Sequence, residues 1–394
     1  MFFNFGKNIY SCEQRSPADM LAACLTFCIE TKKEMRMNVK KKVVIGMSGG
    51  VDSSVAAYLL KEQGFDVIGV TMQIWQDTTL YEEEDKKSCG ISAIDDARRV
   101  ANQLQIQHHV IDMKESFKCK VIDYFTEEYK LGRTPNPCIV CNRYIKWEEL
   151  LKYGSQIGAD YIATGHYARI CQLSNGRYAV KKSATSVKDQ TYALYKLTQE
   201  QLKHTLMPIG DYTKDEIRGI AEKIGIQVAH KQDSMEICFI PDNDYAKYIV
   251  DKTHYRCDFG NFVDVHNNII GTHKGIIHYT IGQRKGLGLS MGKPVFVVAI
   301  RPETNEVVIG DDTDVFSDKL YANNVNFMGI ENITNPIKVQ AKVRYSHKGS
   351  DCLVRMIDND TLECIFDEPV RAITPGQAVV LYNEDICLGG GTIL

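Results

Sequence analysis

Residues 43–54 of the chain read Val-Val-Ile-Gly-Met-Ser-Gly-Gly-Val-Asp-Ser-Ser, and this stretch decides the fold. Its apolar first half is typical of a short buried strand, and the run from Ser53 to Gln63, followed by Gly64, predicts a helix that ends at a glycine. Between them, Gly49 and Gly50 allow backbone N–H groups to approach an anion, and the helix N-terminus adds partial positive charge. The stretch therefore predicts a strand, a phosphate-binding loop and a helix.

This loop differs from the two commonest nucleotide-binding loops. It lacks the Gly-Lys-Ser/Thr sequence of γ-phosphate transfer and the Gly-x-Gly-x-x-Gly fingerprint of dinucleotide binding. A Gly-Gly pair alone is compatible with a tight turn, but the full sequence 48–54 resembles the loop of the N-type ATP pyrophosphatases. That resemblance implies cleavage of ATP to AMP and pyrophosphate, adenylation of a carbonyl oxygen, and a magnesium ion held by Asp52.

Strands and helices alternate on the C-terminal side of the loop. Apolar runs at 66–74, 108–113 and 161–164 predict strands, and amphipathic runs at 92–104, 114–130 and 143–156 predict helices. This alternation predicts an α/β domain with a doubly wound parallel sheet. From about residue 255 short alternating runs separated by turns predict a small central β-rich domain and then a C-terminal β-barrel.

The expected domains are 41–240 for catalysis, 241–310 for the central part and 311–394 for the barrel, which would contact RNA. Residues 1–40 form an extension that we expect to be disordered, and a misplaced start codon would explain it equally well. Its acidic residues are unlike those of a transit peptide.

Composition narrows the class of protein. Of 394 residues, 44% are hydrophobic and 25% are charged, which is typical of a soluble globular chain, and no apolar run is long enough for a membrane span. The net charge of −3 excludes coating of nucleic acid by charge alone, but not a local basic surface. Thirteen cysteines without a signal peptide indicate a cytoplasmic protein with mostly reduced thiols, in which a disulfide would be transient and catalytic.

Three cysteines lie in sequence contexts that indicate a catalytic or metal-binding role. Cys138 and Cys141 lie in Thr-Pro-Asn-Pro-Cys-Ile-Val-Cys-Asn, residues 134–142, which we place between two helices; Cys238 follows about 100 residues later. An incidental pair or half of a zinc site is the plain alternative, but zinc needs four ligands and no second close Cys or His pair is present.

These motifs, taken together, resemble the tRNA-specific 2-thiouridylase family. The resemblance runs from about Lys41 to the C-terminus and also rests on residues 164–167, 188–190 and 279–288, which read Thr-Gly-His-Tyr, Lys-Asp-Gln and Tyr-Thr-Ile-Gly-Gln-Arg-Lys-Gly-Leu-Gly. It implies an enzyme that uses ATP and Mg²⁺ to adenylate the C2 carbonyl of a uridine in tRNA and then replaces that oxygen with sulfur. The implied target is the wobble uridine of the tRNAs for lysine, glutamate and glutamine.

The resemblance assigns roles by position. Cys141 would be the nucleophile, and Cys238 would carry sulfur as a persulfide. The implied ATP contacts, with Met72 at the adenine, are Gly46, Met47, Ser48, Gly49, Gly50, Val51, Asp52, Ser53, Met72 and Gly165. The implied contacts of the target base are Asn136, Pro137 and Cys138. The implied tRNA contacts are His166, Lys188, Asp189, Gln190, Arg344, Tyr345 and Gln377.

One position departs from the family pattern. Many members carry Asp where this chain has Cys138, and a thiol matches a carboxylate poorly in acid–base chemistry. The replacement creates a set of three thiols, Cys138, Cys141 and Cys238, which is also the number that holds a [4Fe–4S] cluster with one iron open for sulfide. A persulfide relay and a cluster-dependent route therefore remain as alternatives. The sulfur source, either a cysteine desulfurase or a carrier protein, is not named by the sequence, and neither is the oligomeric state.

RNA binding has its own signal in the segment 338–355. Five basic residues accompany one acidic residue there, with Tyr345 and His347 interleaved, as expected for phosphate contacts and base stacking. A solvated barrel face is the plain alternative, as a structural histidine is for His166. Two rival functions also remain: an amide-forming or amidine-forming synthetase, which has no need for Cys141 and Cys238, and an RNA-binding module without catalysis.

Overall fold

The computed structural model describes residues 40–74, 91–185, 188–226, 228, 237–240, 242 and 244–394. Residues 42–394 form one compact unit, and this unit is described below. The expected disorder of the N-terminal extension concerns residues 1–39, which lie outside the described residues.

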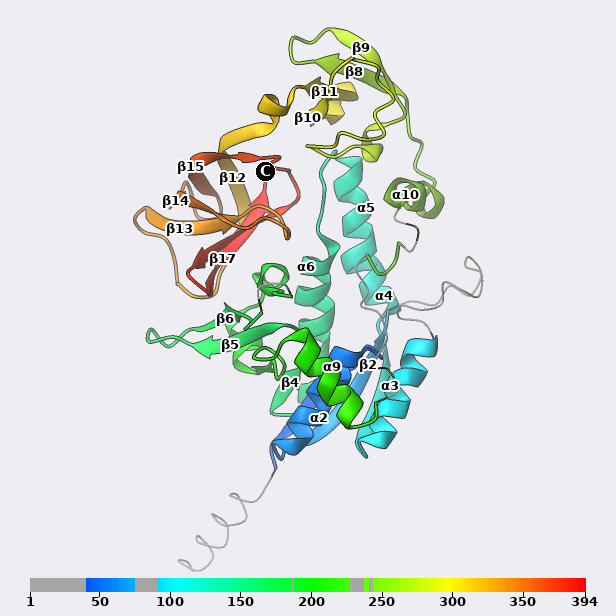
Figure 1. Ribbon diagram of the computed structural model, residues 1–394, viewed down its shortest axis with the longest axis vertical. Coiled ribbons are helices and arrows are strands. Elements are labelled where there is room, and N and C mark those ends of the chain that lie inside the picture. Colours follow the sequence, from blue (N-terminus) through cyan, green and yellow to red (C-terminus); the bar gives the residue numbers. More distant parts are fainter. Residues whose placement is uncertain are drawn as a thin grey trace, which may run out of the picture. The chain divides into compact units, whose positions relative to one another are not determined.

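A parallel sheet forms the first part of the unit, as predicted (Figure 1). Its strand order is β3-β2-β1-β4-β7, and every neighbouring pair is parallel. The strands are β1 (Lys42–Gly46), β2 (Asp66–Gln73), β3 (Gln107–Asp112), β4 (Tyr161–Ala163) and β7 (Thr205–Leu206). The chain builds the sheet outward from β1 to β3 and then returns to the other side of β1. The crevice between the carboxyl ends of β1 and β4 is therefore the switch point at which α/β sheets bind ligands.

Helices cover both faces of this sheet, because successive side chains of a strand point to opposite sides. Val43 and Ile45 pack in one apolar cluster with α2 (Val51–Glu62), α3 (Ile91–Gln103) and α9 (Lys214–Lys223). Val44 packs on the other face, with side chains of the helix that contains Trp147 and Leu150. Figure 1 shows α2 and α9 side by side, and the two helices contact each other.

Two long helical segments follow β3. The first consists of α4 (Lys114–Phe117), a π-helical turn (Lys118–Ile122) and α5 (Asp123–Lys130). The second consists of α6 (Pro137–Cys141), a π-helical stretch (Asn142–Glu149) and α7 (Leu150–Gln156).

The second segment corrects one expectation. We placed Cys138 and Cys141 between two helices, but the helix begins at Pro137 and includes both cysteines. Proline at the first helical position already has the required φ, and the side chain of Asn136 accepts a hydrogen bond from the N–H of Cys138 (3.2 Å). Pro137 therefore starts the helix instead of belonging to a connection between two helices.

The central part is a four-stranded sheet with the order β10-β11-β8-β9. It consists of β8 (Gly260–Asp264), β9 (Ile269–His273), β10 (Phe296–Arg301) and β11 (Glu306–Gly310), and it follows α10 (Tyr245–Thr253). The pair β11–β8 is parallel and the others are antiparallel, so the predicted β-rich domain is a mixed sheet.

The C-terminal part is the predicted barrel. Six antiparallel strands close on themselves because β12 pairs with both β15 and β17. They are β12 (Phe316–Phe327), β13 (Ile337–Lys342), β14 (Ser350–Met356), β15 (Leu362–Arg371), β16 (Ala378–Asn383) and β17 (Ile386–Ile393). The shorter helices of the unit are α8 (Gln199–Lys203) and the 3₁₀ turns at Thr191–Leu194, Ile276–His278, Pro302–Thr304 and Asp312–Val315.

A hairpin that the sequence did not suggest joins the first part to the barrel. Strands β5 (Ala168–Gln172) and β6 (Tyr178–Lys182) follow β4 in the chain, but β6 pairs with the barrel strand β17 at Ile386. Further links are the hydrogen bonds from the N–H of Thr134 to the carbonyl of Pro375 (2.8 Å) and from Gln377 Nε2 to the carbonyl of Thr134 (2.9 Å). Within the described part of the chain, no helix is both long enough and apolar enough to cross a membrane.

Candidate active site

The loop between β1 and α2 has the geometry of an anion-binding site. Gly50 is the N-cap of α2 in an extended conformation and provides no side-chain cap, so the first N–H groups of the helix are not capped by a side chain. The hydroxyl of Ser53 accepts a hydrogen bond from the N–H of Ser48 (3.2 Å), and that of Ser54 donates to the carbonyl of Gly50 (2.8 Å). The loop is thereby closed over the helix end, where partial positive charge favours phosphate.

Two glycines of the predicted nucleotide site are required by space. Gly49 has φ +69°, and a Cβ on it would lie 2.4 Å from the carbonyl oxygen of Ala93. A Cβ on Gly165, in the loop after β4, would lie 2.6 Å from the backbone nitrogen of Ser53. The loop after β4 therefore packs directly on the first turn of α2, and the structure brings Gly165 together with the loop as expected.

Met72 connects this loop with the cysteines. Its methyl group would be 3.5 Å from a Cβ on Gly46, so its side chain lies beside the end of β1. The same side chain packs against the apolar cluster that contains Cys141. The implied adenine contact thus lies beside the end of β1 and packs against the same extended cluster as Cys141.

Asp52 has partners that the sequence did not reveal. Lys214 Nζ lies 2.8 Å and 2.9 Å from its two carboxylate oxygens, and the hydroxyl of Tyr167 donates to Oδ1 (2.8 Å). Lys214 is the first residue of α9, whose N-terminus is closed by a capping box of Thr213 and Glu216. The sequence contains one indication of such a partner. A cation is unfavourable in the first turn of a helix, so a lysine at this position indicates an anion nearby.

The three cysteines differ in their surroundings. Cys138 is exposed, Cys141 is buried in an apolar cluster with Val140 and Ile145, and Cys238 is half-buried and packs against the same cluster. The structure shows no disulfide bond among the described cysteines, which include Cys138, Cys141 and Cys238. Among the described residues, which include all three cysteines, no group of three or more His, Cys, Asp or Glu side chains is placed to hold a metal ion.

The exposed face near Cys138 gathers several of the expected tRNA contacts. Tyr345 is 50% exposed and lies edge-to-face with Tyr192, at 6.2 Å between ring centroids. Partial burial raises the pKa of Tyr345, the charges of Asp189 and Cys138 raise this pKa further, and that of Lys188 lowers it. Charge effects of this kind indicate that Cys138, Lys188 and Asp189 lie in the neighbourhood of this half-exposed ring.

Other expected tRNA contacts have structural partners. Asp189 accepts hydrogen bonds from the N–H of Ser183 (3.2 Å) and the hydroxyl of Thr191 (2.7 Å). Gln190 Oε1 accepts from the N–H of Tyr167 (2.8 Å). Both side chains therefore help to fix the conformation of the loop that contains Lys188.

Arg344 and Gln377 line a cavity of about 250 Å³ where the three parts of the unit meet. Its other lining residues are Thr134, Thr280, Ile281, Gly282, Arg371, Ala372 and Thr374. Arg344 Nη1 donates to the carbonyl of Arg371 (2.8 Å), which fixes the guanidinium at the cavity wall. Thr134 lies two residues before Asn136, so the cavity is lined from the same stretch of chain that is expected to contact the base.

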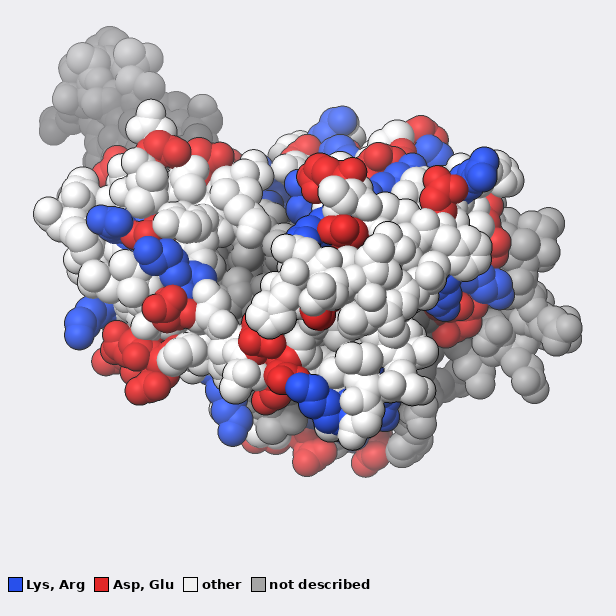
Figure 2. Space-filling model, turned by 90° about the horizontal axis from the view of Figure 1, so that it is seen from above, with Lys and Arg blue, Asp and Glu red and all other residues white. Residues whose placement is uncertain are grey.

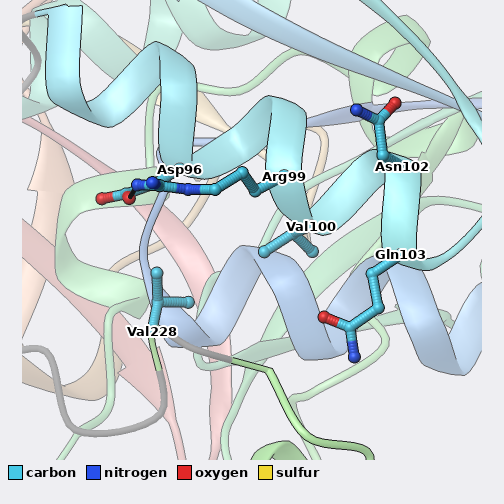
Figure 3. Close-up of a pocket in the computed structure, with 6 residues that line it drawn as sticks. All are labelled: Asp96, Arg99, Val100, Asn102, Gln103 and Val228. Atoms are coloured by element: carbon cyan, nitrogen blue, oxygen red, sulfur yellow. Dashed lines mark hydrogen bonds and ion pairs between the residues drawn. The ribbon is translucent and has the colours of Figure 1, made fainter.

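A second cavity, of about 270 Å³, lies apart from these residues (Figure 3). It is lined by Asp96, Arg99, Val100, Asn102, Gln103 and Val228, and in Figure 3 the side chains of Asp96 and Arg99 lie against each other over the helix α3. None of the predicted site residues lines it.

Charge on the surface is mixed. On the face shown in Figure 2, basic and acidic side chains are interspersed. Of the basic segment, Arg355 is engaged by the buried carboxylate of Glu363, and Lys342 lies over the ring of Tyr382 at 6.0 Å. The segment therefore offers fewer charges to RNA than its composition indicates.

His166 lies at the carboxyl end of β4, where its imidazole contacts the hydroxyl of Thr164 (2.9 Å between Nδ1 and Oγ1) and the ring of Trp147 (5.2 Å). Burial, and then the positive charge of Lys146, hold the pKa of His166 well below its ordinary value. The imidazole is therefore neutral near pH 7, and its contact with RNA would be a hydrogen bond or a stacking interaction.

This pKa predicts an effect of pH on stability. In the unfolded chain His166 takes up a proton near pH 6.5, whereas in the folded chain it stays neutral, so acidification favours unfolding. Between about pH 7.5 and pH 5.5, the wild type should lose about 1 kcal/mol more free energy of unfolding than His166→Gln. Urea denaturation of both proteins across this range measures the difference, and equal losses would contradict the assignment.

The sheet, the loop at its switch point and the adjoining Met72 define a HUP-type nucleotide-binding domain. The family model described as "tRNA methyl transferase HUP domain" matches residues 41–242. Models described as "tRNA methyl transferase PRC-barrel domain" and "Aminomethyltransferase beta-barrel domain" match residues 248–311 and 317–393.

The chain belongs to the tRNA-specific 2-thiouridylase family. It is 63% identical over 355 residues to the tRNA-specific 2-thiouridylase MnmA of Lachnoclostridium phytofermentans, which covers 90% of this chain and 99% of that one. It is 57% identical over 358 residues to MnmA of Clostridioides difficile, covering 91% of this chain and 99% of the relative. The resemblance stated from the motifs is thereby confirmed.

Solved structures offer only distant likenesses. The NH3-dependent NAD synthetase from Campylobacter jejuni, in complex with a nitrate ion, is 15% identical with a TM-score of 0.31 and covers 58% of this chain and 83% of that chain. The NMN synthetase from Francisella tularensis is 13% identical with a TM-score of 0.31, covering 57% and 81%. These values are too low to support a statement about this chain's function.

Proposed function

We propose that the enzyme converts the wobble uridine of the tRNAs for lysine, glutamate and glutamine to 2-thiouridine, with ATP as activator and Mg²⁺ bound together with it. The observation that carries the proposal is the position of Met72, whose side chain lies beside Gly46 of the nucleotide site and packs against the cluster containing Cys141 and Cys238. Activation by ATP and attack by sulfur require this adjacency.

Activation is needed because the C2 carbonyl of uracil is a poor electrophile. The oxygen at C2 attacks the α-phosphorus of ATP, a C2–O–P bond forms, and the bond from this phosphorus to pyrophosphate breaks. The uncapped N–H groups of α2 and the hydroxyl of Ser48 would bind the leaving pyrophosphate. The remaining implied ATP contacts are Met47, Gly49, Gly50, Val51, Asp52, Ser53 and Gly165.

A magnesium ion would neutralise phosphate charge in this step. Mg²⁺ is commonly held by one or two carboxylates together with substrate phosphates. Asp52 supplies one carboxylate in the first turn of α2, beside the phosphate loop, and so it fits this role.

Sulfur transfer would use the cysteine pair. The terminal sulfur of a persulfide on Cys238 attacks C2, and Cys141 then attacks the inner sulfur, which breaks the S–S bond and leaves sulfur on the base. AMP departs with the former carbonyl oxygen, and Cys141 and Cys238 end as a disulfide that two electrons and two protons reset. A cysteine desulfurase or a carrier protein would regenerate the persulfide in the cytoplasm.

The cluster-dependent alternative fits this structure less well. Cys138 is exposed while Cys141 is buried, and the three thiols are not among side chains placed to hold a metal ion in the part of the chain that is described. We therefore propose the persulfide route. An iron-to-protein ratio of about 3 or more in anaerobically purified, active enzyme would reverse this choice.

The RNA would be held across the domains proposed at 41–240, 241–310 and 311–394. A base buried in an active site must leave its stack, and an anticodon loop presents such a base at low cost. Asn136, Pro137 and Cys138 would contact the target base, because they begin the helix that carries Cys141. Tyr345, Lys188, Arg344, Gln377 and His166 would contact the surrounding nucleotides, and Asp189 and Gln190 would shape the loop.

Mass spectrometry of nucleosides tests the proposal. Unmodified tRNA, ATP, Mg²⁺ and a persulfide donor are incubated with wild type and Cys138→Asp, and both 2-thiouridine and pyrophosphate are measured. We expect 2-thiouridine with both proteins, because Asp at this position restores the common family residue and leaves Cys141 and Cys238 in place. Thiolation lost only in Cys138→Asp would favour the cluster. Pyrophosphate released without thiolation would favour a synthetase.

A further inference from the structure

Lys214 and Asp52 form an ion pair that joins helix α9 to helix α2 beside the phosphate loop. Lys214 is the first residue of α9, and Asp52 lies in the first turn of α2, directly after the phosphate loop. The Lys214 side chain is 10% exposed and that of Asp52 is 27% exposed. Its ammonium contacts both carboxylate oxygens, at 2.8 Å and 2.9 Å, and lies 5.9 Å from the ring centroid of Tyr167.

This position is costly for a lysine. The N-terminus of a helix carries partial positive charge, and the other charged residues of this first turn, Asp215 and Glu216, are acidic as that charge favours. Burial removes much of the hydration of the ammonium. The carboxylate of Asp52 offsets this cost, although the positive end of α2 beside it also disfavours a nearby cation.

A purely structural ion pair is the plain alternative. Buried ion pairs are often no more stabilising than apolar pairs of the same volume, so packing α9 on α2 does not by itself require a lysine here. The same two carboxylate oxygens are those that the proposed function offers to Mg²⁺. The ammonium and the metal ion therefore compete for one anion.

We propose that Lys214 neutralises Asp52 in the nucleotide-free enzyme and moves onto the phosphates when ATP and Mg²⁺ bind. There its charge offsets the negative charge that develops on pyrophosphate as the bond to the α-phosphorus breaks. The ammonium keeps its proton throughout, so the step needs no acid or base. A lysine suits this exchange because its flexible stem carries a compact charge with three donors.

Tyr167 keeps the carboxylate in place during the exchange. Its hydroxyl holds Asp52 Oδ1 independently of Lys214, and its backbone is fixed to Gln190 through two hydrogen bonds (2.8 Å and 3.0 Å). Tyr167 is therefore a positioning residue, and Tyr167→Phe removes a hydrogen bond from Asp52 without removing charge.

Lys214→Met tests the inference, with Lys214→Arg as the charge-retaining variant and Lys223→Met as a control in the exposed last turn of the same helix. With tRNA present, we expect kcat for pyrophosphate release to fall about 100-fold in Lys214→Met and about tenfold in Lys214→Arg, with KM for ATP changed severalfold at most. Lys223→Met should stay within about threefold of the wild type.

The discriminating measurement is the Mg²⁺ dependence of nucleotide binding, followed with a fluorescent ATP analogue in the absence of tRNA. Because the competing ammonium is removed, Lys214→Met should bind at a several-fold lower Mg²⁺ concentration than the wild type, and a cooperative melting transition shows that the variant is folded. A higher Mg²⁺ requirement, or pyrophosphate release within about threefold of the wild type, would overturn the inference. The inference rests on the proposed function, but the binding measurement does not: a wild type that releases no pyrophosphate with tRNA refutes the function and leaves the competition testable.

Discussion

Serine in place of Cys141 is expected to reduce formation of 2-thiouridine at least about 1,000-fold, while pyrophosphate release continues within a few-fold of the wild type. Adenylation needs the phosphate loop and not the thiol, whereas the serine hydroxyl is a far weaker nucleophile toward a persulfide. Nucleosides and pyrophosphate are measured in the same reaction. Cys141 is buried in an apolar cluster, so Cys141→Ala is assayed beside it to separate the loss of sulfur from the burial of a hydroxyl.

Variants at two further cysteines show whether the loss of 2-thiouridine is specific to the proposed sulfur-transfer pair. Cys238→Ser should likewise abolish 2-thiouridine formation while pyrophosphate release continues, because it would remove the persulfide carrier. Cys119→Ser is the matched control, since Cys119 is an exposed thiol in the π-helical turn before α5, and it should leave both products unchanged. Substantial thiolation by Cys141→Ser and Cys141→Ala would show that sulfur reaches the base by another route.

Alanine in place of Gly165 is expected to lower kcat/KM for ATP by more than about 100-fold. The added Cβ would lie 2.6 Å from the nitrogen of Ser53 and 2.8 Å from the carbonyl carbon of Asp52, and both atoms belong to backbone that cannot turn aside. The first turn of α2 must then shift, and with it the N–H groups that bind phosphate. Steady-state kinetics of pyrophosphate release measure the loss.

Gly219→Ala is the control for this change. Gly219 lies inside α9, has no atom within 4 Å of an added Cβ, and gains helix propensity on substitution. It should keep full activity and raise the melting temperature slightly. If Gly165→Ala binds and cleaves ATP like the wild type, the loop after β4 does not support the nucleotide site.

The nucleotide half of the site could be predicted from sequence because its signals are local. The strand, the glycine pair and the helix follow one another in residues 43–63, and turn, cap and helix propensities act over a few residues. The helix around Cys141 was missed at its start, since Pro137 was interpreted as part of a loop rather than as a first helical residue. Both readings fit a proline, and only the cap at Asn136 distinguishes them.

The remaining contacts depend on pairs far apart in sequence. Lys214 meets Asp52 across 162 residues, and no pattern along the chain encodes that distance. The hairpin β5–β6 was missed for a related reason: its five-residue strands carry little periodicity, and their partner β17 follows about 200 residues later. Asp189 and Gln190 have structural partners for which an isolated Lys-Asp-Gln motif gives no signal.

The hairpin has a consequence for how this chain can be divided. Lys181 pairs with Ile386, and the N–H of Lys182 donates to the carbonyl of Asp385 (2.7 Å), so the last strand of the barrel is completed from the front half of the chain. Cutting near residue 311 would separate β6 from β17 and break this pairing. The barrel closes on itself, but its last strand also carries this link to the first part of the chain. A chimaera that exchanges the barrel between relatives would keep this link if it also exchanged residues 168–182. We therefore expect these residues and the barrel to change together during evolution.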